Sequence, residues 1–347
     1  MKKTTLFLAL LAAAAPAAES PVKVGFCART ITSAAAPFAI ATKLGWYAPA
    51  GIKVQLVPVP GSTDCTKLVA TGDLPYSLPS IEPLPAALRQ GVKAKIFFTA
   101  YQGNIYGIAV PAQSAVRSIK DLKGKKIGVA SMGSGGVPVA RGLLAMNGLD
   151  PEKDVHIVVV GESAQAAALV RARQVEALSL YDTQYALVDN AGVELRMLDS
   201  GPVARFPSNG FLALEETLEK NRAQAAALVK GYAMGTVFAM ANPEAAVKIL
   251  YEVYPQTKPT GKNEEEGLRD DVKTLLARAA HWKLEAGGVK RWGESSLKDF
   301  DAYQDFLVRW KVIEAKVPVT DLVTNELIDE VNRFDPAKIA AEAKAYR

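Results

Sequence analysis

The sequence contains very few histidines and cysteines. Its 347 residues include two histidines, His156 and His281, and two cysteines, Cys27 and Cys65. The histidines lie in unrelated segments without the spacing of metal ligands, which argues against a metal site. Neither histidine is near a plausible nucleophile in the sequence, and the chain has no Gly-x-Ser-x-Gly elbow and no His-Glu-x-x-His helix. We therefore expect no metal, no cofactor and no enzymatic activity.

The sequence also lacks a strong excess of one charge. Its 41 Lys and Arg residues oppose 36 Asp and Glu residues, a net charge of +5 that falls to +3 without Lys2 and Lys3. An excess this small does not indicate nucleic-acid binding. The most apolar internal stretch, residues 223–241, has Lys230 near its middle, and a central lysine costs about 2.5 to 3.5 kcal/mol in a membrane. We expect this stretch to be a buried helix of a soluble fold.

The first 18 residues have the layout of a secretory signal peptide. Met1-Lys2-Lys3 is basic, residues 4–14 are apolar but too few to span a bilayer, and Ala15-Pro16-Ala17 supplies small residues for cleavage. We expect cleavage after Ala17 or Ala18. No cysteine follows the apolar region where lipid attachment would need one, so the exported protein is expected in a Gram-negative periplasm without a lipid anchor.

The two cysteines predict a disulfide. An even pair in an oxidising compartment is typical of one. Cys27 and Cys65 each follow a predicted strand, in loops that neighbouring strands of one sheet would bring together. Closing this loop would stabilise the fold by about 4 kcal/mol on the chain-entropy model. The alternative is two free, buried thiols.

From Pro21 onward, short β-rich runs alternate with helical runs. The expected strands are 22–26, 53–57, 74–77, 93–99, 105–110, 126–130, 155–160, 177–180, 195–198 and 211–214. The expected helices between them are 37–47, 62–71, 82–90, 118–122, 137–147, 164–173 and 185–191. The remaining helices are expected at 215–241, 243–254, 264–282, 295–310 and 325–332, with a capped helix start at Asp335-Pro336. This alternation predicts mostly parallel sheets with helices on both faces.

The alternation of predicted strands and helices is interrupted once and then resumes. The sequence therefore predicts two α/β units. A chain of this length usually divides its core in two. The units are joined only by the short segments 100–104 and 201–210, and two such thin connections suggest a hinge. We expect one lobe from residues 19–103 and 208–347, and a second lobe from residues 104–207.

Two turns rich in glycine and serine each follow a strand and open a helix. In Ser131-Met132-Gly133-Ser134-Gly135-Gly136, the N–H groups of a helix start could contact an anion. The turn lacks the Gly-Lys-Ser/Thr ending of a P-loop, and Pro138 replaces the third glycine of the dinucleotide fingerprint, so no nucleotide is expected. An ordinary capped turn is an equal alternative. For the second turn, Pro60-Gly61-Ser62-Thr63-Asp64, a plain helix cap is the more common interpretation.

Ligands of open α/β sheets bind outside the carboxyl ends of the strands. The loops at those ends supply the candidate ligand-binding residues. They are Phe26, Arg29, Thr30, Gly61, Ser62, Thr63, Ser80, Tyr101, Asn104, Ser131, Gly133, Ser134, Gly135, Tyr181, Asp182 and Thr183. Together they would form a cleft with hydroxyls, amides, one guanidinium and aromatic faces. Glu162 and Asp182 could form a carboxylate pair, although a cap or a hydrogen-bond acceptor is the simpler role.

Several motifs agree in order and spacing with one known family. They are Leu44-Gly45-Trp46-Tyr47 followed by residues 50–54, Leu68-Val69-Ala70-Thr71-Gly72-Asp73, residues 119–129, Asn147-Gly148-Leu149-Asp150, and residues 324–329 with Asn332. With the signal peptide and first strand, they resemble periplasmic solute-binding proteins of ABC importers, in the branch for nitrate, sulfonates, taurine and thiamine-pyrimidine precursors. The resemblance covers nearly the whole mature chain.

This resemblance implies a two-lobe periplasmic-binding-protein type II fold, with mixed, mostly parallel sheets flanked by helices. Two crossover segments would form its hinge. The lobes would close on one small solute and present it to an ABC permease with its ATPase, and we expect a monomer. A binding protein that delivers its solute to a sensor protein instead of a permease would have the same fold and the same kind of site.

The solute class is less specific in the sequence. Arg29, the two helix starts and the mildly basic chain favour a small anionic organic solute, a sulfonate or carboxylate that is possibly aromatic. The alternative is a neutral thiamine-pyrimidine-type heterocycle. A pyrimidine-precursor synthase of similar fold is more remote, because it would need clustered cysteines for iron and a Lys and a His in the first lobe. Residues 19–103 contain no His, and the two cysteines are far apart.

Overall fold

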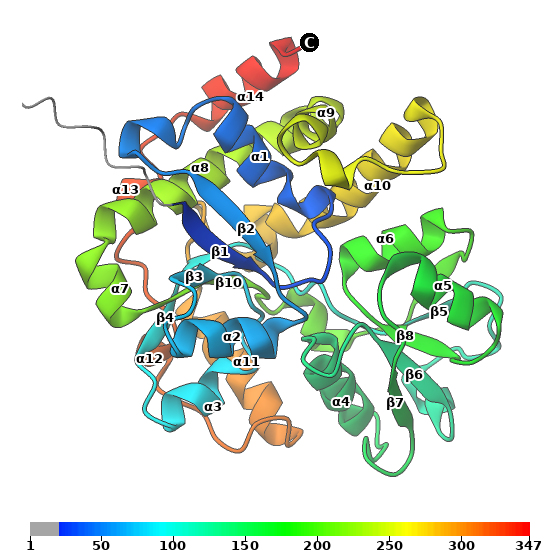
Figure 1. Ribbon diagram of the computed structural model, residues 1–347. Coiled ribbons are helices and arrows are strands. Elements are labelled where there is room, and N and C mark those ends of the chain that lie inside the picture. Colours follow the sequence, from blue (N-terminus) through cyan, green and yellow to red (C-terminus); the bar gives the residue numbers. More distant parts are fainter. Residues whose placement is uncertain (1–20) are drawn as a thin grey trace, which may run out of the picture.

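The computed structural model describes residues 21–347, so the predicted signal peptide lies outside the described residues. The described chain forms two separate five-stranded β-sheets, and helices flank both of them (Figure 1). Each sheet has four parallel strands and one antiparallel strand. This confirms the predicted fold class of two mixed, mostly parallel sheets with helices.

The first sheet has the strand order β2-β1-β3-β10-β4. Its strands are β1 (Val22–Phe26), β2 (Val54–Pro58), β3 (Tyr76–Ser77), β4 (Ala94–Thr99) and β10 (Gly210–Leu214). The helices between them are α1 (Ala36–Lys43), α2 (Ser62–Ala70) and α3 (Leu84–Arg89). β10 lies antiparallel between β3 and β4 and brings the chain back from the second sheet.

The second sheet repeats this plan with the order β7-β6-β8-β5-β9. Its strands are β5 (Ala109–Pro111), β6 (Lys126–Val129), β7 (His156–Val159), β8 (Ala177–Ser179) and β9 (Leu195–Met197). Its helices are α4 (Gly136–Met146), α5 (Ser163–Arg171) and α6 (Asp182–Asn190). Here β5, the first strand after the crossing, is the antiparallel one.

After β10 the chain is helical and covers the first sheet (Figure 1). These helices are α7 (Glu215–Lys220), α8 (Arg222–Ala241), α9 (Pro243–Val253), α10 (Glu264–Trp282), α11 (Leu297–Arg309), α12 (Val319–Leu322), α13 (Ile328–Val331) and α14 (Pro336–Ala345). Short 3₁₀ turns occur at Ser33–Ala35, Ala48–Ala50, Ile119–Leu122, Gly201–Arg205, Pro255–Thr257 and Leu284–Gly287.

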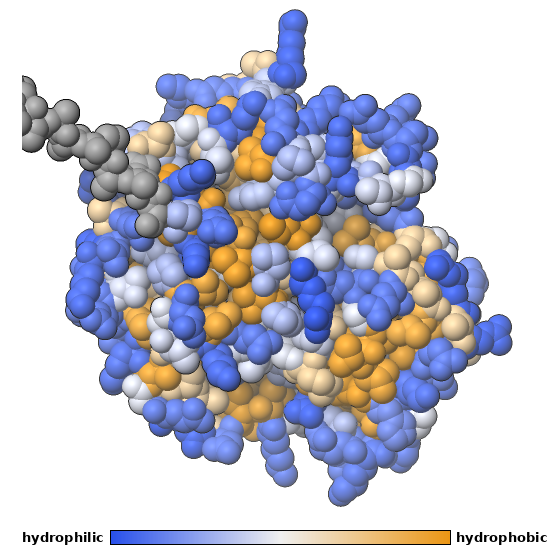
Figure 2. Space-filling view, viewed as in Figure 1, coloured by the Kyte–Doolittle hydropathy of each residue, from blue (hydrophilic) through white to orange (hydrophobic). Residues whose placement is uncertain are grey.

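Helix α8 explains the apolar stretch 223–241. It packs against α1 and α14. In the core, the ring centroid of its Tyr232 lies 4.9 Å from that of Phe38 and 5.0 Å from that of Phe211. Burial on most sides therefore accounts for its composition. Among residues 21–347, no helix combines the length and apolar character that a membrane crossing needs. In Figure 2, hydrophobic residues reach the visible surface in patches at the centre and at the lower right, and hydrophilic residues surround them.

Several expected elements are shorter in the structure, such as the helix expected at 325–332, which is Ile328–Val331. Three further differences have a clear local reason. The helix expected at 215–241 is two helices, because Asn221 has φ −123° and ψ 33° and interrupts the helical backbone. The helix expected at 118–122 is a 3₁₀ turn closed by a capping box between Ser118 and Asp121. The strand expected at 105–110 begins only at Ala109, because the preceding residues cross between the sheets and Tyr106 makes one isolated bridge to Tyr181.

Helix α10 adds a connection that the sequence did not indicate. It belongs to the chain beyond β10 but packs along α6 of the second sheet (Figure 1). Asn190 Nδ2 donates to the carbonyl oxygen of Asp270 at 2.9 Å, and Lys273 forms an ion pair with Asp189. The two sheets are therefore linked by α10 as well as by the two crossing segments.

Candidate functional site

A narrow cavity lies between the two sheets, at the carboxyl ends of β1, β4 and β8. It is lined by Phe26, Cys27, Ala28, Thr32, Ala34, Leu78, Tyr101, Ile105, Tyr106, Tyr181, Thr183, Asn209 and Arg278. About 30 Å³ of it is open to the centre of a water molecule, which is room for a few waters. Any larger solute must enter while the two sheets are further apart.

The cavity wall is aromatic with hydroxyl tips. Tyr101, Tyr106 and Tyr181 all line it, and the rings of Tyr106 and Tyr181 meet edge to face with centroids 6.2 Å apart. Burial raises the pKa of all three phenols, so they remain protonated hydrogen-bond donors at neutral pH. Thr183 is fully buried in the same wall, and its Oγ1 has no hydrogen-bond partner among residues 21–347. Flat rings with polar edges suit such a wall.

One buried ion pair joins the two sheets behind this wall. Arg278 of α10 donates from Nε to Asp182 Oδ2 at 2.7 Å and from an Nη to Oδ1 at 2.6 Å. The guanidinium carbon also lies 4.0 Å from the centroid of the Tyr101 ring, a cation–π contact. Burial is the largest single influence and would lower the pKa of Arg278, but Asp182, Tyr101 and Tyr232 together outweigh it, so the net shift is upward and the guanidinium stays charged. The pair is locally neutral.

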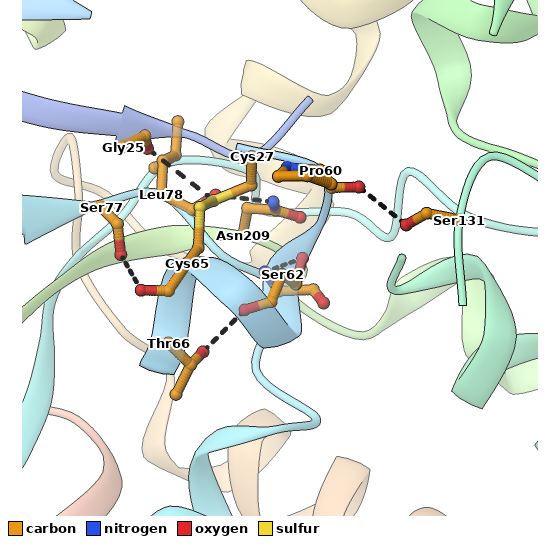
Figure 3. Close-up of a disulfide and its surroundings, with 11 residues drawn as sticks. Gly25, Cys27, Pro60, Ser62, Cys65, Thr66, Ser77, Leu78, Ser131 and Asn209 are labelled. Atoms are coloured by element: carbon orange, nitrogen blue, oxygen red, sulfur yellow. Dashed lines mark hydrogen bonds between the residues drawn. A yellow bond between two sulfur atoms is a disulfide. The ribbon is translucent and has the colours of Figure 1, made fainter. Parts of the chain in front are cut away.

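The two glycine-rich turns pack against each other. Thr63 donates its backbone N–H to the Gly133 carbonyl at 3.1 Å, and Ser131 Oγ donates to the Pro60 carbonyl at 2.7 Å, the contact drawn in Figure 3. A Cβ added to Gly61 would lie 2.6 Å from the Gly133 backbone. The absence of side chains therefore allows the sheets to approach closely at this point.

The start of α4 already uses part of its donor set. Ser134 accepts from Gly136 N at its Oγ, 3.3 Å away, and from Val137 N at its carbonyl, 3.0 Å away. Gly135 packs tightly enough that a Cβ would meet Ser80 Oγ and the Tyr106 ring within 2.6 Å. Close packing explains these glycines without a ligand, and an anion at this turn stays a prediction.

Glu162 bridges the two sheets at the mouth of the cavity. Its Oε1 accepts from the Arg29 backbone N–H at 3.2 Å and from Tyr181 OH at 3.3 Å, and its Oε2 accepts from Thr30 Oγ1 at 2.9 Å. Glu162 therefore does not form a carboxylate pair with Asp182, which is bound by Arg278. It holds the loop after β1 against the end of β8.

The predicted disulfide is confirmed. Cys27 and Cys65 are joined with an S–S distance of 2.03 Å, and Figure 3 shows the bond linking the loop after β1 to α2. Cys65 is fully buried, whereas Cys27 lines the cavity. The bond therefore fixes one wall of the cavity to the first sheet's helix layer.

The predicted site residues fall into three groups. Phe26, Tyr101, Tyr181 and Thr183 line the cavity. Gly61, Ser62, Thr63, Ser80, Asn104, Ser131, Gly133, Ser134 and Gly135 form the packing and hydrogen-bond layer around it. Arg29 and Thr30 are exposed at the mouth, and Asp182 lies behind the wall. The guanidinium at the cavity is therefore that of Arg278, and Arg29 is not among the lining residues.

Sequence reasoning missed Arg278, Tyr106 and Asn209. The only available signal was that Arg278 shares the buried face of its helix with Leu275, Ala279 and Trp282, where the helical period places apolar residues. Asn209 is held by donating its Nδ2 to the Leu78 carbonyl at 2.9 Å. Tyr106 lies in the segment 105–110, where the sequence predicts a strand, but the strand begins only at Ala109.

Below the cavity, Glu82 is a buried carboxyl whose charge depends on pH. Its Oε1 accepts from Tyr303 OH at 2.5 Å. Burial raises the pKa of Glu82 above its ordinary 4.5, and the hydroxyls of Ser80 and Tyr303 lower this pKa by less than burial raises it. A pKa raised by folding gives stability that is complete at low pH and is lost as pH rises through the folded-state value.

We therefore expect Glu82→Gln to gain stability relative to the wild type as pH rises above about 4.5, by about 1.4 kcal/mol per pH unit until the raised pKa is passed. The amide keeps an oxygen for Tyr303. Urea unfolding of both proteins across pH 4 to 8 measures the difference. If the free energies of unfolding of the two proteins had the same pH dependence, folding would not raise the pKa of Glu82.

Comparison with known proteins assigns the chain to a family. Residues 32–246 match the family described as NMT1/THI5 like, which is more than half of the sequence. The chain belongs to the NMT1/THI5-like family. The resemblance predicted from the sequence is thereby confirmed at the level of the family and its fold.

Two proteins of similar sequence and one solved structure of similar fold show what this NMT1/THI5-like chain resembles. The riboflavin-binding protein RibY of Chloroflexus aurantiacus is 23% identical over 84% of this chain and 82% of its own. A 4-amino-5-hydroxymethyl-2-methylpyrimidine phosphate synthase of Legionella pneumophila is 24% identical over 64% and 70%. The structure of the alkanesulfonate-binding protein SsuA of Xanthomonas axonopodis pv. citri, bound to MOPS, has a TM-score of 0.65 at 19% identity, covering 89% and 99%.

Proposed function

We propose that this protein is the periplasmic solute-binding component of an ABC importer, and that it captures a flat heteroaromatic solute between two lobes. The lobes are residues 19–103 with 208–347, and residues 104–207. The solute favours the closed state because it contacts both lobes. The closed protein, a monomer, then presents the solute to a permease and its ATPase. No covalent chemistry is required.

The composition of the cavity wall carries the solute class. Tyr101, Tyr106, Tyr181 and Phe26 supply ring faces, and the unpaired Oγ1 of Thr183 supplies a hydrogen-bond partner. A buried polar atom without a partner is unfavourable in the free protein, so a ligand that satisfies it gains affinity. The names of the two curated relatives, a riboflavin binder and a pyrimidine phosphate synthase, both involve heteroaromatic rings.

The anionic solute expected from the sequence is less well supported. That expectation relied on Arg29, which is exposed at the mouth, and on the start of α4, where neighbouring residues take part of the donors. The buried cation of the wall, Arg278, is neutralised by Asp182. One protein of similar fold binds alkanesulfonates, so the test below includes anions as well.

Thermal-shift measurements test this proposal. Exported protein, stripped of co-purified solute by unfolding and refolding, is titrated with riboflavin and 4-amino-5-hydroxymethyl-2-methylpyrimidine, and separately with benzenesulfonate, benzoate and nitrate. A ligand at 100 times its Kd stabilises by about 2.7 kcal/mol. We expect shifts with a heteroaromatic compound. Shifts with the anions alone would overturn the solute class. Mass spectrometry of the same samples would detect formation of a pyrimidine product, which would favour the synthase function instead.

Substitutions at Thr183 provide a matched control. Thr183→Val has nearly the same shape but lacks the hydroxyl, so we expect it to fold at least as stably as the wild type and to bind the solute about 3- to 10-fold more weakly. Thr183→Ser keeps the hydroxyl and should retain most of the affinity. Equal affinity of the Val variant and the wild type would remove Thr183 from the binding site.

A further inference from the structure

We propose that Asp182 is a specificity-determining residue, which makes the cavity discriminate against anionic solutes by neutralising Arg278. The proposal rests on the proposed function, because it requires that solutes bind in this cavity. It assigns to Asp182 a role in choosing between solutes that is separate from its role in holding the two sheets together.

The two charges face different spaces. Arg278 lines the cavity between the sheets, whereas Asp182 is not among that cavity's lining residues and lines a neighbouring pocket together with Asn104 and His281. The side chains of Arg278 and Asp182 are only 4% and 6% exposed. The cation therefore faces a solute in the cavity, and its counter-charge lies next to it on the side away from that solute.

The carboxylate is fixed in this position by its hydrogen bonds. Its two oxygens accept from two nitrogens of Arg278, and Oδ1 also accepts from the Thr183 backbone N–H at 2.7 Å. This contact holds the carboxylate at the first turn of α6, where the helix dipole favours negative charge. Asp182 is thus held in place by its own helix even if Arg278 were attracted elsewhere.

This arrangement favours neutral acceptors over anions. The guanidinium donors that Asp182 does not use can bind a neutral carbonyl or ring nitrogen without bringing a second negative charge into the site. An anion in the cavity would share one cation with Asp182, and the two negative charges would repel each other where little water screens them. Discrimination of this kind depends on an unfavourable contact with the wrong solute.

Asp182→Asn tests the proposal because it removes the charge and keeps the size. Benzenesulfonate and benzoate are the anionic probes, measured by calorimetry and thermal shift in wild type and variant. We expect both anions to bind D182N at least about tenfold more tightly than they bind the wild type and to raise its unfolding temperature more. The double variant Asp182→Asn/Arg278→Gln, which carries neither charge, should show no such gain.

A second variant tests the pair from the other side, because removing either partner leaves a buried charge unpaired and only one of the two variants needs to fold. Arg278→Gln leaves the carboxylate as the unpaired charge, so the cavity should gain affinity for benzamidinium by a similar factor. A folded D182N without gain for either anion overturns the proposal. So does a folded R278Q without gain for benzamidinium. Failure of the proposed function is distinct, because it appears as wild-type protein that binds no heteroaromatic compound.

Discussion

Gly61→Ala is expected to lower the affinity for the solute by about 100-fold or more while leaving the stability of the free protein nearly unchanged. The reason is steric and applies where the two turns are in contact, which we propose is the closed state. An added Cβ would lie 2.6 Å from the carbonyl carbon and oxygen of Gly133 and 2.9 Å from Ser134 N. These are backbone atoms of the other sheet's turn, which cannot move aside as a side chain can.

Neither the backbone conformation of Gly61 nor its surroundings within the first sheet argue for a folding defect. Its φ of 171° and ψ of 177° are extended and open to any residue, and the three nearest atoms to the added Cβ all belong to the turn after β6. The free, open protein should therefore change by no more than an ordinary surface substitution, about 0.5 kcal/mol. In the variant, a solute could not draw the lobes together and would lose its contacts with one of them. Each factor of ten in Kd corresponds to about 1.4 kcal/mol of binding free energy.

Gly133→Ala is the matched control. Its Cβ would meet Asp64 Oδ2 at 3.1 Å, the mobile end of a side chain, so closure should be only slightly affected. Calorimetry gives the affinities, and small-angle scattering with and without solute shows whether each variant becomes more compact. If Gly61→Ala bound the solute as tightly as Gly133→Ala and closed as fully, the contact between the two turns would not be part of the binding reaction.

The sequence was sufficient for most of the fold because the signals were local. Strand β1 was predicted with its observed bounds, as was α10, since turn residues mark their ends and the apolar period marks their type. The place of β10 between β3 and β4 could not be predicted in this way. Pairing across more than a hundred residues depends on the packing of the whole sheet, and no local pattern records it.

The site was predicted in outline and missed in its charge. The rule that ligands bind at strand ends led to Phe26, Tyr101 and Tyr181. Arg278 comes from α10, which is far from any strand end in sequence and reaches the cavity because α10 packs on α6 and on the turn Ser33–Ala35. The same packing places Asp182 beside it, so the neutral character of the pair becomes visible only in three dimensions.

The second large effect is expected from removing the disulfide. Cys27→Ala/Cys65→Ala should lower the free energy of unfolding by about 4 kcal/mol, because the bond closes a loop with a sequence separation of 38 and restricts the unfolded chain. Alanine avoids placing a hydroxyl at position 65, which is fully buried. Urea unfolding in the presence and absence of reductant measures the effect.

Reductant distinguishes the bond from the substitutions themselves. It should lower the free energy of unfolding of the wild type to that of the double variant and leave the stability of the variant unchanged. Solute affinity should also fall in both cases, because Cys27, Ala28, Thr32 and Ala34 line the cavity from the loop that the bond tethers to α2. A variant as stable as the oxidised wild type would mean that packing alone fixes this loop. A variant that loses stability but keeps its affinity would show that the bond supports the fold without organising the cavity wall.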